Sequence, residues 1–278
     1  MTNESKSTAE ALSAAAKELC KKLRALRFEH PVHTVYNPLE YAWDAYSQYL
    51  NRFGASTKRA FFLGMNPGPW GMAQTGIPFG EVAAVREFLN IQAAIGKPKN
   101  EHPKRPIQGM ECKRSEVSGR RLWGLFSAKY VTPEAFFQQQ FVSNYCPLVF
   151  MDEGGRNLTP DKLPAAEFAP LSQCCDTHLA QMLSILKPDY LIGIGQFAEQ
   201  CLERVAKSAG LEILQASSKA SSKALEQASD AETPKAGYPR VQLSRILHPS
   251  PASPAANRDW AGAAEKALFE AGVWKKKK

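Results

Sequence analysis

The sequence predicts an α/β fold, a three-layer α/β/α sandwich whose centre is a mainly parallel sheet of four strands. Short, almost wholly apolar runs, typical of strands buried on both faces, alternate with longer segments of helical periodicity. Two of these runs also end in rigid loops rich in proline. Strands that alternate with helices are typical of a parallel sheet covered on both sides. The expected strands span residues 59–63, 141–150, 189–194 and 241–247.

Helical signals recur along the chain. In residues 7–27, leucines repeat at intervals of three and four, and the segment begins with the capping-box pattern STAE, which predicts an amphipathic helix. Ser253 and Pro254 have the residue types of an N-cap and a first helical position, so the last helix is expected to begin there. Further helices are expected at residues 81–91, 165–187 and 196–209, with helical turns at 122–126 and 133–140.

The chain of 278 residues is long enough to bury a sizeable core and is expected to form a single domain. This domain would include an insert rich in serine, alanine and lysine at residues 215–237 and a basic tail at 275–278. No apolar run approaches the roughly 20 residues needed to span a bilayer, and the N-terminus has no signal-peptide pattern. The six cysteines form no C-x-x-C pair. We expect a monomer of the cytoplasm or nucleus, not secreted, with no cofactor, metal or membrane partner.

Positive charge is unevenly distributed. The formal net charge is +8 and the isoelectric point is near 9.1, a balance compatible with a polyanionic partner. Residues 97–121 hold eight lysines and arginines against three glutamates. This segment is either a solvated surface loop or a region that contacts phosphate groups. In the second case, Arg120 and Arg121 are the candidate contacts.

The stretch at residues 64–80, GMNPGPWGMAQTGIPFG, follows the first expected strand. A buried parallel strand that ends in a rigid loop builds a floor at the carboxyl edge of the sheet, where α/β folds bind ligands. The loop has few ionisable groups and offers instead the carboxamide of Asn66, the backbone of Met65 and Gly68, and the ring of Phe79. Such a pocket suits a flat, uncharged ligand that forms hydrogen bonds.

A second loop of this kind, LHPSPASP at residues 247–254, follows the last expected strand and carries His248. The histidine either belongs to a two-sided site with the first loop or caps the adjacent helix. Asn144 lies within the apolar run 141–150. If the Asn144 amide is buried without hydrogen-bond partners, its desolvation costs roughly 1–3 kcal/mol. Asn144 therefore either bonds a neighbouring loop or pairs with the edge of a ligand.

The two loop sequences resemble the active-site motifs of the single-strand-selective monofunctional uracil-DNA glycosylases. The resemblance extends through residues 116–119, 141–148 and 193–195 and covers roughly residues 28–274. It implies a uracil-DNA glycosylase-like fold and a DNA partner that contains uracil, single- or double-stranded. The implied reaction flips the uracil out and hydrolyses its N-glycosidic bond, which leaves an abasic site for base excision repair.

The resemblance assigns catalysis to Asn66, which would place the attacking water, and to His248, which would stabilise charge on O2 of the departing base. A neutral Asn instead of a strong base predicts a moderate rate that depends on leaving-group stabilisation. Phe79 would stack on the base and Asn144 would pair with its N3–H and O4. Room beside Gly68 would admit 5-substituted uracils such as 5-hydroxymethyluracil.

A base cannot be reached inside a duplex and must be extruded, at a cost of a few kcal/mol. The candidate wedge, the part of the second loop that would push the base out of the duplex, has small side chains. The wedge of vertebrate family members carries bulkier polar residues. We therefore predict a preference for single-stranded or mismatched uracil. Neither motif contains a lysine, so no lyase step is expected. The residues of this DNA-contacting loop are Ser250, Pro251, Ala252, Ser253 and Pro254.

Two other interpretations have to be weighed. A non-catalytic module that binds an extruded or single-stranded base would keep the pocket without the reaction, and an assay of free uracil release would separate the two. Residues 193–198, GIGQFA, fit the dinucleotide fingerprint of an oxidoreductase. The next regular strand ends in His248 rather than in an acidic residue, so we interpret these glycines as close packing of a helix on a strand.

Overall fold

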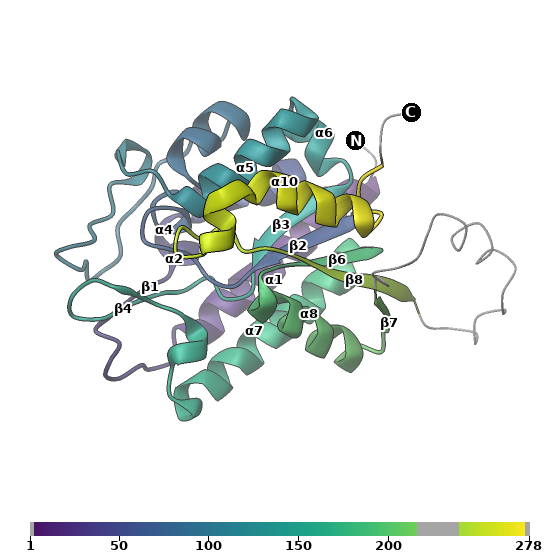
Figure 1. Cartoon of the computed structure of the whole chain (residues 1–278). Coiled ribbons are helices and arrows are strands. Elements are labelled where there is room, and N and C mark those ends of the chain that lie inside the picture. Colours follow the sequence, from purple (N-terminus) through teal and green to yellow (C-terminus); the bar gives the residue numbers. More distant parts are fainter. Residues whose placement is uncertain (1–2, 216–238, 276–278) are drawn as a thin grey trace, which may run out of the picture.

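The computed structural model describes residues 3–215 and 239–275. Its centre is a sheet of five parallel strands in the order β3-β2-β6-β8-β7 (Figure 1). These strands are β2 (Ala60–Gly64), β3 (Gln140–Asn144), β6 (Tyr190–Ile194), β7 (Glu212–Gln215) and β8 (Arg240–Ile246). A smaller antiparallel sheet joins β1 (Thr34–Tyr36), β4 (Val149–Met151) and β5 (Asn157–Leu158).

Helices cover both faces of the central sheet, which confirms the predicted three-layer α/β/α sandwich (Figure 1). Phe62 of β2 packs against Phe126 and Phe136 on one face, and Tyr49 donates a hydrogen bond to the Val142 carbonyl of β3. The first face carries α5 (Val117–Tyr130), α6 (Pro133–Phe137) and α10 (Pro254–Glu270). The other face carries α7 (Ala165–Leu186) and α8 (Gln196–Ser208), and α1 (Asn3–Leu23) packs on α7. Shorter helices are α2 (Pro38–Tyr41), α3 (Trp43–Phe53) and α4 (Met72–Thr75), with helical turns at Ala84–Phe88, Gly109–Glu111 and Pro160–Lys162.

The prediction of four strands was wrong because a fifth strand, β7, pairs with β8 at the edge of the sheet. β7 has four residues, and its Leu214 is exposed. Such a short segment has too little apolar periodicity to be recognised from the sequence. The predicted insert at residues 215–237 lies outside the described residues except for Gln215, the last residue of β7, and the predicted tail lies outside them except for Lys275.

The apolar run 141–150 is not one strand, as predicted, but contributes to two strands in different sheets, β3 and β4. The intervening loop contains Pro147, which has no N–H for a sheet ladder. Asn144 is consequently the last residue of β3 rather than a mid-strand residue. This correction places its side chain at the carboxyl edge of the sheet.

The helix predicted from Pro254 does begin there, and the Ser253 hydroxyl accepts a hydrogen bond from the Ala256 N–H at 3.3 Å. The helix predicted at residues 81–91 is shorter and includes a π-helical turn, Ala84–Phe88. The N-terminal helix begins earlier than predicted and ends at Leu23. In the described ranges, no helix is long and apolar enough to cross a bilayer.

Candidate active site

Parallel strands bring their carboxyl ends to one edge of a sheet, and the loops that follow β2, β3, β6 and β8 therefore lie together. A Cβ added at Gly64, the last residue of β2, would lie 2.5 Å from Cζ of Phe79 and 2.6 Å from Oδ1 of Asn144. The Phe79 ring and the Asn144 amide thus converge over a backbone position where only glycine leaves room. This convergence lies at the carboxyl edge of the sheet, where the sequence predicts the floor of a pocket.

Asn144 is only 8% exposed, yet its amide is poorly satisfied by the protein. Its Nδ2 donates to the Met72 sulfur at 3.4 Å, and a thioether is a weak acceptor. No hydrogen bond to Oδ1 of Asn144 is formed by any residue that the structure describes. A buried amide with an open acceptor and a further N–H favours pairing with a ligand that offers the opposite pattern.

Phe79 is held in an unusual backbone conformation, with φ of 54°. This left-handed region is rarely adopted by aromatic residues and persists where the surroundings impose it. The Phe79 carbonyl accepts from the Glu81 N–H at 2.7 Å. It also faces Gly119 on α5, where an added Cβ would lie 2.0 Å from the carbonyl oxygen. Gly119 therefore allows a close approach to the Phe79 backbone.

The N-terminus of α5 supports the same loop. The Glu116 carboxylate caps this helix by accepting from the N–H groups of Ser118 at 3.0 Å and Gly119 at 2.6 Å. An added Cβ at Gly71, in the first motif, would lie 3.1 Å from Cγ of Glu116. Burial raises the pKa of the Glu116 carboxyl, opposed by these two hydrogen bonds. Residues 116–119 thus position the pocket, a role that sequence reasoning did not assign.

The Asn66 side chain has a defined orientation. Its Nδ2 donates to the Leu148 carbonyl at 3.2 Å and to the Pro67 carbonyl at 3.3 Å. Across the described chain, no donor bonds to Oδ1 of Asn66. The orientation leaves the carboxamide oxygen as a hydrogen-bond acceptor, which is the group needed to hold a water.

His248 follows β8 and has a defined tautomer. The Ser250 N–H donates to Nδ1 of His248 at 3.1 Å, so Nδ1 carries the lone pair and Nε2 carries the hydrogen. Burial lowers the pKa of His248 below its ordinary value, which favours the neutral ring. The ring centroids of His248 and Phe79 are 6.5 Å apart. The site therefore presents a neutral imidazole N–H beside the aromatic wall.

The glycines of GIGQFA serve packing, as interpreted from the sequence. An added Cβ at Gly193 would lie 2.5 Å from the Glu199 nitrogen, so α8 packs closely on β6. Gly195 has φ of 91°, and an added Cβ would lie 3.2 Å from Cβ of His248. Gly195 therefore makes room for the histidine itself, a link that the fingerprint could not reveal.

The predicted DNA-contacting loop is held from within. Arg121 donates through Nη1 to the carbonyls of Pro249 at 3.1 Å and Ser250 at 3.4 Å, and through Nη2 to Oδ1 of Asn257 at 2.9 Å. Arg121 thus has protein partners that the sequence did not predict. Arg120 is exposed, and within the described part of the chain its side chain bonds only the Ser115 hydroxyl, at 3.2 Å. The loop tip, Pro251 and Ala252, is exposed.

Two backbone positions of the first motif differ in what they can offer. A Cβ added at Gly68 would meet no atom within 4 Å, so this side of the loop opens to free space. The Met65 carbonyl accepts from the Cys146 N–H at 2.9 Å and is therefore occupied. Met65 can offer its N–H, whereas Gly68 borders the open side.

Gln74 has a role that sequence reasoning missed. It is fully buried, and its side chain joins the first motif to the basic segment 97–121. Nε2 donates to the carbonyls of Pro69 at 3.0 Å and Pro106 at 3.2 Å, and Oε1 accepts from the N–H groups of Gln108 at 2.8 Å and Gly109 at 3.1 Å. Three of these hydrogen bonds hold the basic segment, and the fourth holds Pro69 of the first motif.

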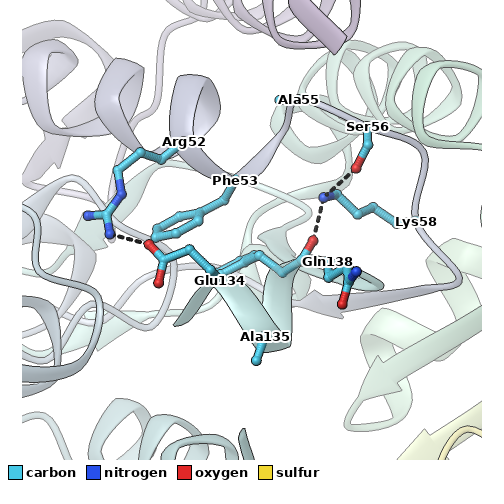
Figure 2. Close-up of a pocket in the computed structure, with 9 residues that line it drawn as sticks. Arg52, Phe53, Ala55, Ser56, Lys58, Glu134, Ala135 and Gln138 are labelled. Carbon is cyan, nitrogen blue, oxygen red and sulfur yellow. Dashed lines mark hydrogen bonds and ion pairs between the residues drawn. The ribbon is translucent and has the colours of Figure 1, made fainter. Parts of the chain in front are cut away.

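A pocket of about 430 Å³ lies elsewhere, between the residues that precede β2 and those that precede β3 (Figure 2). This is the amino edge of the sheet, opposite the candidate site. Figure 2 shows that its charged groups have protein partners: Lys58 donates to the Ser56 hydroxyl, and Arg52 pairs with Glu134. Lys58 also donates to the Phe137 carbonyl. Burial lowers the pKa of Lys58 to about 8. Lys58 caps the carbonyl of Phe137, the last residue of α6, which gives it a structural role.

Comparisons with known proteins agree with this architecture. Residues 51–271 match the family model of the uracil DNA glycosylase superfamily. The chain belongs to this family, which confirms the resemblance drawn from the two motifs.

Relatives with high identity carry a more specific name. Over 268 residues, the chain is 41% identical to the single-strand selective monofunctional uracil-DNA glycosylase of Rattus norvegicus. The aligned residues cover 96% of this chain and 86% of the relative. The Bos taurus protein of the same name is 40% identical over 268 residues, covering 96% and 88%. Among solved structures, SMUG2 of Pedobacter heparinus has a TM-score of 0.53 and 16% identity over 93% of this chain and 94% of that one, a likeness of fold.

Proposed function

We propose that the protein is a monofunctional uracil-DNA glycosylase, which releases uracil from DNA by hydrolysis and leaves an abasic site for base excision repair. The observation that carries the proposal is the convergence of Phe79 and Asn144 over Gly64, beside a neutral His248 whose Nε2 bears the hydrogen. The names of the relatives support the same reaction.

Recognition of the base follows from the pocket. The Phe79 ring stacks on a flipped uracil, and the open Oδ1 of Asn144 accepts its N3–H while Nδ2 donates to O4. Cytosine presents a donor where uracil presents O4, so the same amide orientation does not match it. The open space beside Gly68 supports acceptance of 5-substituted uracils such as 5-hydroxymethyluracil.

The reaction breaks the bond between C1′ and N1, and the bonding electrons leave with the base. Oδ1 of Asn66 accepts a hydrogen bond from a water on the opposite face of the sugar, and the water oxygen bonds to C1′ as it becomes oxocarbenium-like. Nε2–H of His248 donates to O2 of the departing uracil anion, an interaction that strengthens as charge develops. The proton lost by the water completes the free uracil. Neither motif supplies an amine, so the abasic product is not cleaved further.

The proposal is tested by single-turnover release of uracil from single-stranded DNA in the presence of EDTA, with wild type, Asn66→Ala and His248→Ala. Each variant is expected to lose roughly 10²-fold or more in rate while it still binds DNA. Retained binding with no release by wild type would instead identify a non-catalytic base-binding module. Wild-type rates in both variants would remove the two loops from the mechanism.

The remaining expectations extend this proposal. We infer a single domain that acts as a monomer on uracil-containing DNA, in a cytoplasmic or nuclear setting. The continuity of the central sheet across the matched residues 51–271 supports the single domain. The exposed tip formed by Pro251 and Ala252, together with exposed Arg120, supports contact with DNA at the mouth of the pocket.

A further inference from the structure

Two arginines of the basic segment lie over one tryptophan of the first motif. The guanidinium carbon of Arg114 is 4.8 Å from the Trp70 ring centroid, and that of Arg105 is 5.2 Å from it. Both distances are within the range of cation–π attraction. We refer to Trp70, Arg105 and Arg114 together as the arginine clamp.

Among the residues that the structure describes, neither clamp arginine has an acidic partner. Elsewhere in the same region, Lys97 pairs with Glu101 and Arg86 pairs with Glu111. Arg105 and Arg114 belong to none of the ion pairs found within residues 3–215 and 239–275. Nε of Arg105 is moreover buried without a hydrogen-bond partner in that part of the chain. Two adjacent uncompensated cations and an unpaired donor favour an anionic ligand.

The clamp is held in place by the surrounding backbone. The Tyr36 hydroxyl donates to the Arg105 carbonyl at 2.8 Å, and the Arg105 N–H donates to the His102 carbonyl at 2.9 Å. Gln74 bonds the carbonyl of Pro69, the residue before Trp70, and the carbonyl of Pro106, the residue after Arg105. Both sides of the Arg105–Trp70 contact are therefore joined by one buried side chain.

The clamp also lies next to the candidate active site along the chain. Trp70 follows Asn66 by four residues, and Gly71 packs against Glu116, two residues after Arg114. A strand whose nucleotide enters the pocket must pass the mouth of this loop. Successive phosphates on that strand would then come within reach of the two guanidinium groups.

We propose that the arginine clamp binds backbone phosphates of the DNA strand that carries the target nucleotide. The proposal rests on the proposed function, which supplies DNA as the ligand. Nη1 of Arg105 donates to the Lys104 carbonyl at 2.9 Å, so among the described contacts Nη2 of Arg105 and the guanidinium edge of Arg114 are left for phosphate oxygens. Stacking on Trp70 also restricts both side chains before DNA arrives, so less conformational freedom is lost on binding. The clamp holds the strand by its backbone, which is useful where the wedge loop is small.

The test measures affinity for a short single-stranded oligonucleotide with thymine in place of uracil, so that binding is independent of base release. Dissociation constants are determined over a series of salt concentrations for wild type, Arg105→Gln, Arg114→Gln, Trp70→Leu and Trp70→Phe. The matched control is Lys129→Gln. Lys129 is also a cation over a tryptophan, 4.4 Å from the Trp274 ring centroid, but it lies in the last turn of α5.

Each arginine variant is expected to reduce the slope of log affinity against log salt by about 0.7, the value for one phosphate contact on a single strand. Trp70→Leu is expected to weaken binding about tenfold although it changes no charge, whereas Trp70→Phe keeps an aromatic face and stays close to wild type. Lys129→Gln should leave the slope unchanged.

Arginine variants that match Lys129→Gln in slope and affinity would overturn the clamp, as would equal binding by Trp70→Leu and wild type. Thermal melting identifies any variant that fails to fold, in which case the remaining arginine variant decides. Release of uracil from a uracil-containing oligonucleotide is measured separately. If the clamp variants bind DNA like wild type while uracil is still released, this inference alone is refuted. If the clamp variants bind DNA more weakly but wild type releases no uracil, the proposed reaction alone is refuted.

Discussion

The Ser250 N–H donates to Nδ1 of His248 at 3.1 Å, and this bond determines which ring nitrogen carries the hydrogen. Protonation of Nδ1 would turn the acceptor into a second donor and break the bond. Because burial lowers the pKa of His248, the neutral tautomer is the form present at neutral pH. The imidazole therefore acts as an oriented hydrogen-bond donor without carrying a full charge.

The first prediction concerns the pH dependence of catalysis. The rate of uracil release is expected to be constant above about pH 6.5, the ordinary pKa of histidine, and to fall at lower pH as the Ser250 bond is lost. Single-turnover rates at a series of pH values measure this. His248→Ala should show a low rate without this acid limb. A rate that instead rises as pH falls below 6.5 would make the imidazolium the active form.

The second prediction concerns Gly64, which lies under both walls of the pocket. Gly64→Ala places a methyl group within 2.6 Å of Phe79 Cζ and Asn144 Oδ1, so both side chains must move. Displacement of this size is expected to lower uracil release by about 10²-fold. The control is Gly124→Ala on α5, where an added Cβ meets no atom within 4 Å and is expected to stabilise the helix by up to about 1 kcal/mol. Equal release rates for the two variants would contradict the assigned pocket.

The third prediction concerns Gln74, which bonds both the first motif and the basic segment. Gln74→Leu leaves the N–H groups of Gln108 and Gly109 without their partner and is expected to destabilise the protein by about 3 kcal/mol. Denaturant unfolding measures this loss. The matched control is Gln48→Leu, which removes one exposed hydrogen bond to the Gln92 carbonyl and should cost less than about 1 kcal/mol. Similar losses in both variants would show that Gln74 does not hold the segment.

The sequence signals that predict the candidate site are local. An apolar run followed by a proline-rich loop marks a strand end wherever it occurs, and parallel strands bring such ends together. Asn66 and His248 were therefore assigned to one edge of the sheet although 182 positions separate them along the chain. The break between β3 and β4 also had a local signal in Pro147, which the interpretation of 141–150 as one strand overlooked.

The supporting contacts could not be predicted in this way. Gln74 reaches Pro106 across 32 residues, and Trp70 reaches Arg105 and Arg114 through the same segment. That segment lacks periodicity, so its path depends on tertiary contacts alone. The approach of Gly119 to the Phe79 carbonyl likewise depends on where α5 packs.

The fourth prediction concerns acid stability and His178 of α7. This side chain is 5% exposed, and burial lowers its pKa to about 4, against a hydrogen bond to Ala15 and the charge of Glu18, both on α1. The unfolded chain binds a proton below about pH 6.5, whereas the folded protein does so only below about 4. As the pH decreases through this range, the free energy of unfolding is therefore expected to decrease, by at most about 1.4 kcal/mol per pH unit.

Denaturant unfolding of wild type and His178→Gln at several pH values isolates this contribution. As the pH falls over that range, the free energy of unfolding of wild type should decrease relative to that of the variant. His33→Gln, at an exposed position, is the matched control and should follow wild type. A difference that is independent of pH would show that His178 is not held neutral by α1 and α7.

The last prediction concerns the wedge loop. Ala252 is exposed at its tip and has a small side chain, whereas the loop base is well anchored by Arg121 and by the Ser253 cap of α10. A rigid loop with a small tip can contact an extruded nucleotide but offers little volume to fill the gap in a base stack. Wild type is therefore expected to release uracil fastest from single-stranded DNA, more slowly from a U·G mismatch and slowest from a U·A pair.

Ala252→Leu should raise the U·A rate several-fold and leave the single-strand rate unchanged, because only the duplex has a stack to fill. Single-turnover assays on the three substrates measure both effects. Equal wild-type rates on single-stranded and U·A substrates would show that base extrusion does not depend on the size of this tip.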